Sequence, residues 1–252
     1  MRALVVALSL TFFGCSTLSV NHPATRTIRK VAIVGFGVEQ QMPPEFSLAS
    51  FGKPAEGKWG KVAGVTYGLD HAGRMYAGLA ATLKKELGWK VLAAQEVARA
   101  PEYAAAFKDR TSGLQTRPIL PQDYELFGVP GVLDAYSFEK LSHEERQKVI
   151  SGLGVDAIAI ATVSVQLERG GGIKQLVGAG DYFPRAHLRF TVFRRGEDTP
   201  AWQDFRAMGE AVSQGTEHVL GITDGARLNE QVVGAGGDAC RKLLERYRNA
   251  EG

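Results

Sequence analysis

The sequence has no marked excess of charge of either sign and no cluster of metal-ligating residues. Its 30 basic and 27 acidic residues give a formal net charge of +3 over 252 residues. So small an excess is not the electrostatic footprint of a nucleic-acid-binding protein. No histidine is spaced from another histidine or a cysteine as zinc ligands are; the five are His22, His71, His143, His187 and His218. We therefore expect no nucleic-acid partner, no metal and no other cofactor.

A long apolar run of the kind that spans a bilayer, about 20 residues, is also missing at the start of the chain. Met1 and Arg2 precede an apolar run from Ala3 to Phe13 that only Ser9 and Thr11 interrupt. A short basic start, an apolar stretch of about 7–15 residues and a small residue before the cleavage point are typical of a secretory signal. We predict that residues 1–14 are a signal peptide.

The end of this segment, Phe12-Phe13-Gly14-Cys15, resembles the lipobox of bacterial lipoproteins. The resemblance implies that Cys15 is diacylated, becomes the first mature residue and anchors the chain to a membrane. Two or three acyl chains anchor a protein stably, whereas one binds only marginally. Ser16 stands where lipoproteins of the inner membrane carry Asp, so the resemblance implies the periplasmic face of the outer membrane. The alternative is an ordinary signal peptide that is cleaved elsewhere.

Cysteine is scarce in the rest of the chain, where Cys240 stands alone. With Cys15 occupied by lipid, no internal disulfide can form, although an exported domain is free to use disulfides. The domain must then be stable through packing alone. Residues 16–29 are polar and show no period, so we predict a lipidated tether over 15–29 and a single domain over 30–248.

Hydrophobic periodicity predicts a mixed α/β domain with the order β-α-β-α-α-β-β-β-α. The predicted strands are 30–36, 89–94, 155–166 as the central one, and a hairpin formed by 188–193 with 201–209. The predicted helices are 70–87, 96–107, one that Ser142 and Glu145 start with a capping box, and 225–247. Gly234, Gly236 and Gly237 in the last helix predict that it packs closely against the sheet.

Three segments carry a resemblance to a family of envelope lipoprotein domains: KVAIVGF at 30–36, GWKVLAAQEV at 88–97 and LGVDAIAIATV at 153–163. This group includes the curli secretion lipoprotein, the lipoprotein activators of penicillin-binding proteins and the amino-terminal domain of the Tol-system propeller protein. The similarity covers about 30–245 without two irregular insertions. It implies a three-layer-like α/β sandwich with a mixed sheet, which binds another envelope protein and is not an enzyme.

The two insertions, 38–68 and 108–140, have no sustained period and are rich in aromatic residues. Interfaces favour aromatic side chains, because each buries a large area at a low entropy cost. We therefore predict partner contacts at Phe46, Phe51, Trp59, Tyr67, Tyr124 and Phe127. The alternative is that these aromatic side chains fold back as lids over the core.

Fragments of catalytic motifs occur, but each lacks the residues that would complete it. Gly35-Phe36-Gly37 has Gln40 where a dinucleotide-binding fingerprint needs its third glycine. Ser137 and Lys140 match S-x-x-K, but no S-D-N or K-T-G follows them. Ser213 lies in a near match to G-x-S-x-G, and no histidine after His218 can complete a triad. We interpret these fragments as chance matches.

The sequence thus favours a non-catalytic adaptor or assembly factor bound to the membrane. The alternative function is a subunit of an oligomeric outer-membrane secretion pore of the curli-channel type. A pore would need paired strands of about 9–11 residues with alternating apolar and polar side chains, and region 163–193 meets this condition in part. Four arginines within 185–195 indicate either a solvated sheet face or attraction to anionic lipid or an acidic partner; they are Arg185, Arg189, Arg194 and Arg195.

Overall fold

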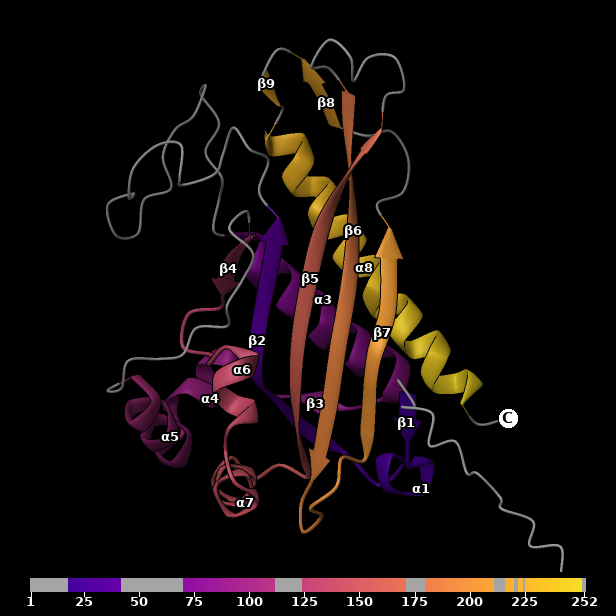
Figure 1. Cartoon of the computed structure of the whole chain (residues 1–252). Coiled ribbons are helices and arrows are strands. Elements are labelled where there is room, and N and C mark those ends of the chain that lie inside the picture. Colours follow the sequence, from indigo (N-terminus) through magenta and orange to yellow (C-terminus); the bar gives the residue numbers. More distant parts are fainter. Residues whose placement is uncertain are drawn as a thin grey trace, which may run out of the picture.

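The structure, a computed structural model, describes residues 18–41, 70–111, 124–170, 180–210, 216–219, 222–223 and 225–250. An open mixed sheet carries helices on both of its faces (Figure 1). The strands are β1 (Leu18–Val20), β2 (Lys30–Gln41), β3 (Lys90–Val91), β4 (Tyr124–Gly128), β5 (Ala157–Gly170), β6 (Gly180–Arg194), β7 (Trp202–Glu210), β8 (Thr216–Val219) and β9 (Ile222–Thr223). The helices are α1 (His22–Thr25), α3 (Asp70–Leu87), α4 (Ala94–Arg99), α5 (Pro101–Thr111), α6 (Ala135–Glu139), α7 (His143–Gly152) and α8 (Gly225–Asn249).

Strand β5 lies at the centre of the sheet, whose order is β1-β7-β6-β5-β2-β3. It runs parallel to β2 and antiparallel to β6, so that Ile158 lies between Ala32 and Phe193. Strand β4 pairs with the second half of β2, and β8 pairs with the start of β6. The prediction of a central strand over 155–166 is confirmed, as is the β6–β7 hairpin.

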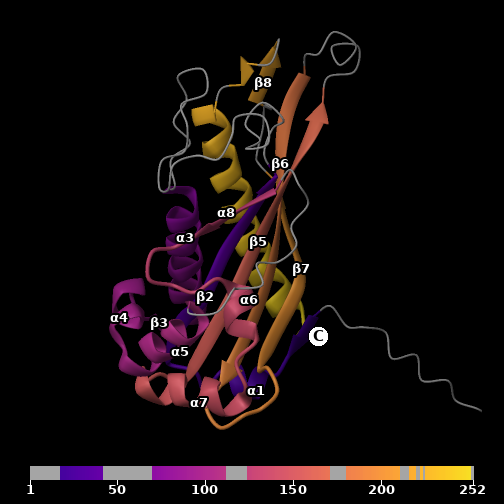
Figure 2. The same cartoon turned by 60° about the vertical axis from the view of Figure 1, so that its left-hand side comes forward.

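Two hydrophobic clusters on opposite faces of the sheet give the domain three layers, as predicted. The larger cluster joins the sheet to α3 and α8 and includes Phe190, Trp202, Leu79 and Leu243. The smaller cluster joins Val34, Ile158 and Ile160 to α4, α5, α6 and α7. Figure 2 shows α3 and α8 on one side of the sheet and α6 and α7 on the other. The apolar alternation of β2 and β5 supplies both clusters, because successive side chains of a strand point to opposite faces.

The helix predictions hold for three of the four helices. Helix α3 covers the predicted residues 70–87, and α8 covers 225–247. Ser142 accepts a hydrogen bond from the Glu145 amide, and the Glu145 carboxylate accepts one from the Ser142 amide, which confirms the capping box of α7. The predicted helix 96–107 is two helices, because the chain is extended at Ala100 and α5 begins at Pro101. A proline disfavours helical conformation at the residue before it.

The prediction of a tether over 15–29 is wrong from Leu18 onward. Strand β1 pairs with the start of β7, and α1 follows it directly. The hydroxyl groups of Thr25 and Tyr247 are 2.8 Å apart, and the ring centroids of His22 and Tyr247 are 4.7 Å apart. These polar residues join the fold through contacts with α8, more than 200 positions later in the chain, which no local period can reveal.

The two predicted insertions are also shorter than expected. Residues 38–41 extend β2, and 124–140 form β4, a turn and α6, while 42–69 and 112–123 lie outside the described residues. Phe138, a residue of α6, is fully buried in the smaller cluster. The second half of the 108–140 insertion is therefore a lid over the core, the alternative that the sequence left open.

Close packing between α8 and the sheet depends on a glycine of the sheet. A Cβ atom at Gly209 of β7 would overlap the carbonyl oxygen of Ala235 and the amide nitrogen of Ala239 in α8. Around Gly234 and Gly237 there is open space, and Gly236 faces Met75 of α3. The prediction that the three α8 glycines pack against the sheet is therefore wrong.

Among the described residues, none of the helices combines the length and the apolar character that crossing a bilayer requires.

Candidate functional site

The candidate site is the part of one sheet face that α4, α5, α6 and α7 leave uncovered, while α3 and α8 pack on the opposite face. Figure 1 shows this face toward the viewer across β5, β6 and β7. We call it the open sheet face and define it by Ser164, Gln166, Arg185, His187, Arg189, Phe205 and Met208. Met208 is the exposed large hydrophobic residue of the described chain, with 41% of its surface accessible. The side chains of His187, Arg189 and Phe205 are half-buried.

Strand register places the residues of the open sheet face in rows. Ser164 of β5 lies opposite His187 of β6, which lies opposite Met208 of β7. In the next row Gln166 lies opposite Arg185. Cross-strand neighbours have Cβ atoms about 4.5–5.5 Å apart, so each row forms a continuous surface. This surface mixes polar, basic, aromatic and thioether groups within a rigid sheet.

A buried carboxylate at one end of the first row ties the sheet to α6. Glu39 of β2 is only 7% exposed. One of its oxygens accepts a hydrogen bond from the Tyr136 hydroxyl, and the other accepts one from the Ser164 hydroxyl. These partners lie 97 and 125 positions away in the chain. Hydrogen bonds are what make burial of a carboxylate tolerable.

Removing the Tyr136 hydroxyl is expected to destabilise the domain. Tyr136→Phe should lower the free energy of unfolding by about 1.5–3 kcal/mol, because the buried Glu39 carboxylate loses a donor. Urea denaturation measures this change. In a double-mutant cycle with Glu39→Gln, the two effects should not add. Additive effects would show that the hydroxyl does not act through Glu39.

The row formed by Glu39, Ser164 and His187 contains the residue types of a hydrolase triad in a different arrangement. In a triad the imidazole lies between the acid and the serine and accepts the serine proton. Here the acid binds Ser164 directly and also binds Tyr136. The Ser164 proton is therefore directed at the carboxylate, and the arrangement serves to hold α6 and β5 together.

The arginines of the β6 region are distributed over separate local contacts. Arg185 forms ion pairs with Glu168 at 2.8 Å and with Glu210 at 3.4 Å. The Arg189 guanidinium lies 5.3 Å from the centre of the Phe205 ring. Arg185 and Arg189 thus lie on a solvated sheet face, whereas Arg194 pairs with Glu197 and Arg195 follows directly after β6.

Several residues that the sequence singled out have structural surroundings. Ser137 donates to the Asp134 carboxylate at 2.7 Å and belongs to the cap of α6, so its match to S-x-x-K is coincidental. Gly35 is crowded by Ile160 and Phe138, and a Cβ atom there would lie 3.1 Å from each. Ser213 lies outside the described residues.

The predicted partner contacts divide into two groups. Phe127 is only 2% exposed, and its ring centroid lies 4.3 Å from that of His71 in α3. Phe127 of β4 lies opposite Val38 of β2, and its side chain packs in the larger cluster. It is therefore a core residue, and the prediction that it contacts a partner is wrong. Tyr124 is half-buried at the start of β4. Cys15 and four aromatic residues lie outside the described residues: Phe46, Phe51, Trp59 and Tyr67.

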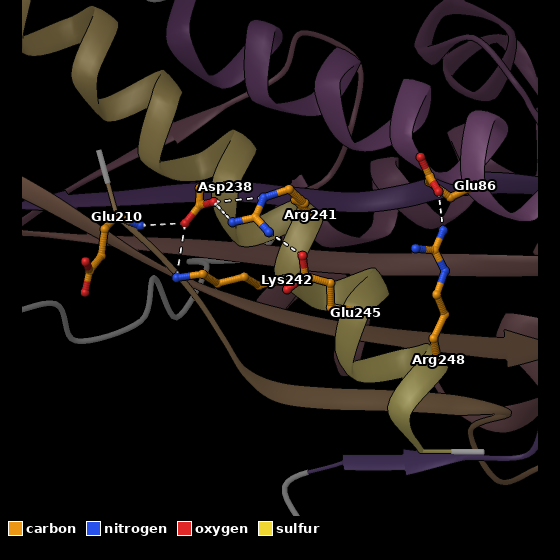
Figure 3. A network of polar contacts seen from close by, with 7 residues as sticks. All are labelled: Glu86, Glu210, Asp238, Arg241, Lys242, Glu245 and Arg248. Carbon is orange, nitrogen blue, oxygen red and sulfur yellow. Dashed lines mark hydrogen bonds and ion pairs between the residues drawn. The ribbon is translucent and has the colours of Figure 1, made fainter. Parts of the chain in front are cut away.

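A groove with a volume of about 440 Å³ lies between α3 and α8, and its lining includes Ala81, Lys85 and Leu244. Its charged groups are paired (Figure 3). Arg248 bonds to Glu86 across the groove, and Arg241 bonds to both Asp238 and Glu245 along α8.

Asp238 lies at the centre of this network of polar contacts. Partial burial raises the pKa of the Asp238 carboxyl, but three donors outweigh that effect and lower it overall. The donors are the Glu210 amide, the Arg241 guanidinium and the Lys242 ammonium. The cations of this groove already pair with carboxylates of the protein. A negatively charged ligand would have to compete with those carboxylates.

Sequence reasoning missed the open sheet face. Phe205 and Met208 lie in a predicted strand, and nothing in their spacing shows which face a helix covers. Within the described ranges, no three His, Cys, Asp or Glu residues are grouped so that they could hold a metal ion.

A comparison with protein-family models gave no match, and a search among curated proteins gave no relative of this chain.

Proposed function

We propose that the chain is a bacterial envelope lipoprotein, anchored through Cys15 at the periplasmic face of the outer membrane, that binds another envelope protein. It acts as an adaptor or assembly factor and performs no catalysis. The resemblance of residues 12–15 to a lipobox supports the anchor. The open sheet face supports the binding role.

The single observation that carries the binding role is the exposure of Met208 beside Phe205 and Arg189 on a rigid sheet. Methionine, aromatic residues and arginine are enriched in protein interfaces relative to the rest of the surface. The Phe205 ring under the Arg189 guanidinium provides a large flat contact whose side chains are already ordered. A partner that covers this surface would therefore lose little conformational entropy in the adaptor.

Site-directed photocrosslinking in cells tests this surface. A photoreactive amino acid at position 208 should give one discrete crosslinked product, and Phe205→Ala should weaken it. The same amino acid at Arg99, an exposed residue of α4 outside the open sheet face, is the matched control. Equal products at positions 208 and 99, or none at 208 in a correctly localised protein, would exclude the open sheet face as the binding site.

The anchor has its own test. Cys15→Ala should leave an uncleaved or soluble form, because the acyl chains that hold the mature chain in the membrane are lost. In a detergent phase split, the unaltered protein should enter the detergent phase with acyl-dependent mobility on a gel, and Cys15→Ala should lose that mobility. Unaltered protein in the aqueous phase would contradict the lipoprotein assignment.

The alternative function is a subunit of an oligomeric outer-membrane secretion pore. The length of the β5–β6 hairpin favours it, because its strands have 14 and 15 residues and a pore strand needs about 9–11. Against it, one face of the hairpin packs on α8 and the other carries Gln166, Glu168 and Arg185. Particle size in detergent separates the two functions, since a pore forms large rings.

A further inference from the structure

The fold begins very close to the proposed lipid anchor. Only Ser16 and Thr17 separate Cys15 from Leu18, the first residue of β1. Three residue steps of an extended chain reach no more than about 11 Å. Strand β1 is itself fixed, because it pairs with the first residues of β7 and the Asn21 amide donates to the Ala201 carbonyl at 2.8 Å. A lipid on Cys15 would therefore hold this end of the domain against the bilayer.

The same end of the sheet is rich in exposed cations. Backbone hydrogen bonds bring them together, because the Lys90 amide donates to the Arg29 carbonyl and the Arg195 amide donates to the Asp156 carbonyl. We call this surface the basic end and define it by three exposed residues, Arg29, Lys90 and Arg195, together with the half-buried Lys30. In Figure 1 it lies at the bottom, with α1, the β6–β7 turn and the start of β2.

Three acidic groups lie near the basic end, and one of them, the Asp156 carboxylate, also attracts the Arg195 guanidinium, so that one acidic group faces four cations there. The Asp156 carboxylate accepts hydrogen bonds from the Arg29 and Lys30 amides at 2.9 and 2.8 Å. Glu197 pairs with Arg194, and Asp198 contacts His143 and Arg146 of α7. Two of the four cations donate to backbone carbonyls, Lys30 to Gly154 and Arg195 to Val155, which directs their charge without neutralising it. The basic end therefore keeps an outward positive charge.

We propose that the basic end binds the headgroups of anionic phospholipids and so fixes the orientation of the domain on the membrane. This inference rests on the proposed anchor at Cys15, which brings the cations to the surface. Electrostatic attraction to a membrane falls off within a Debye length, about 8 Å at physiological ionic strength. A 15-residue tether would let the whole domain leave that field, whereas a connection of two residues holds the β1 edge of the sheet near the bilayer; binding by the cations, which extend from β6 to β3 at the opposite edge, then lays this end of the sheet on the membrane.

The orientation has a consequence for partner binding. With the basic end on the bilayer, the long antiparallel strands β5 and β6 extend from the membrane side to the far end of the domain (Figure 1). The open sheet face then stands upright and is presented sideways, at a set height above the lipid. A partner that is itself fixed in the membrane would meet this face without a search over all orientations.

The test couples the mature chain, 15–252, to vesicles through Cys15 by means of a maleimide lipid. The other cysteine, Cys240, is only 3% exposed, and burial raises the pKa of its thiol to about 12, so Cys15 is the thiol that reacts. The readout, in a Trp59→Phe background, is energy transfer from tryptophan to a dansyl lipid, because Trp89 and Trp202, the two remaining tryptophans, both lie next to the basic end. Vesicles of phosphatidylglycerol and phosphatidylethanolamine are compared with vesicles of phosphatidylcholine.

We expect strong energy transfer on the anionic vesicles and a loss of it, to the phosphatidylcholine level, in Arg29→Gln/Lys30→Gln/Lys90→Gln/Arg195→Gln. A control variant removes four cations that lie away from the basic end and should keep the transfer: Arg74→Gln/Arg169→Gln/Arg185→Gln/Arg227→Gln. In the unaltered chain, 1 M salt should abolish the difference between the two vesicle types, which tests the proposal without any substitution.

Equal transfer on both vesicle types in the unaltered chain, or an equal loss in both variants, would overturn the proposal. The chemical coupling supplies the anchor whether or not a cell lipidates Cys15. A negative result here therefore counts against the basic end, while a negative detergent phase split counts against the lipoprotein assignment.

Discussion

Ile158→Asp is expected to prevent folding. Ile158 is fully buried in β5, the central strand, and it packs in the smaller hydrophobic cluster between β2, β6 and the helices α6 and α7. A carboxylate at this position would be buried among the apolar side chains of that cluster. An unpaired buried charge costs several kcal/mol, against a total stability of about 5–15 kcal/mol for a domain of ordinary stability.

Gln166→Asp, eight residues later in the same strand, is the matched control. Gln166 is exposed on the open sheet face, so its carboxylate would remain in water. Circular dichroism and urea denaturation should show no cooperative transition for Ile158→Asp and a change within about 1 kcal/mol for Gln166→Asp. A soluble Ile158→Asp protein that unfolds cooperatively would disprove the central position of this residue.

Gly209→Val is expected to separate α8 from the sheet. The new side chain would overlap the backbone of α8 at Ala235 and Ala239, and backbone atoms cannot swing aside as a side chain can. Overpacking of a filled core commonly costs about 1–3 kcal/mol. We expect a loss of at least about 3 kcal/mol here, because relief of the overlap requires movement of a helix that covers β6 and β7.

Gly128→Val is the control for this change, since Gly128 is also a strand glycine and a Cβ atom there meets no neighbour within 4 Å. It should leave the melting temperature nearly unchanged. Hydrogen exchange at the α8 amides distinguishes local separation of the helix from global unfolding. Protection of α8 at its original level in Gly209→Val would show that the close approach of helix and strand is not required.

The parts of the fold that could be predicted from the sequence are those whose signal is local. Helix α3 repeats its apolar residues every three or four positions and ends before Gly88, whose φ is +70°. Helix α7 begins at a capping box whose two hydrogen bonds join residues three positions apart. The apolar start of β5 indicated a strand buried on both faces. In each case the sequence signal is local, although the strands β2 and β6 that pair with β5 lie outside that local window.

The candidate site could not be predicted in the same way. Glu39 was predicted to lie in the irregular insertion 38–68, yet β2 continues through it, and Tyr136 and Ser164 satisfy its carboxylate. Met208 and Phe205 were assigned to a strand, but their exposure depends on which face α8 covers. Phe127 was read as a surface aromatic residue and is buried beside His71.

The sequence by itself therefore determined the fold class, the central strand, three of the four predicted helices and the pattern at Cys15 that predicts an anchor. The tertiary structure alone decided that β1 and α1 belong to the domain, that Gly209 admits α8, and that part of one sheet face stays open. The physical reason is distance along the chain. Periodicity and capping are energies of neighbouring residues, whereas the decisive contacts join residues such as Thr25 and Tyr247, which are 222 positions apart.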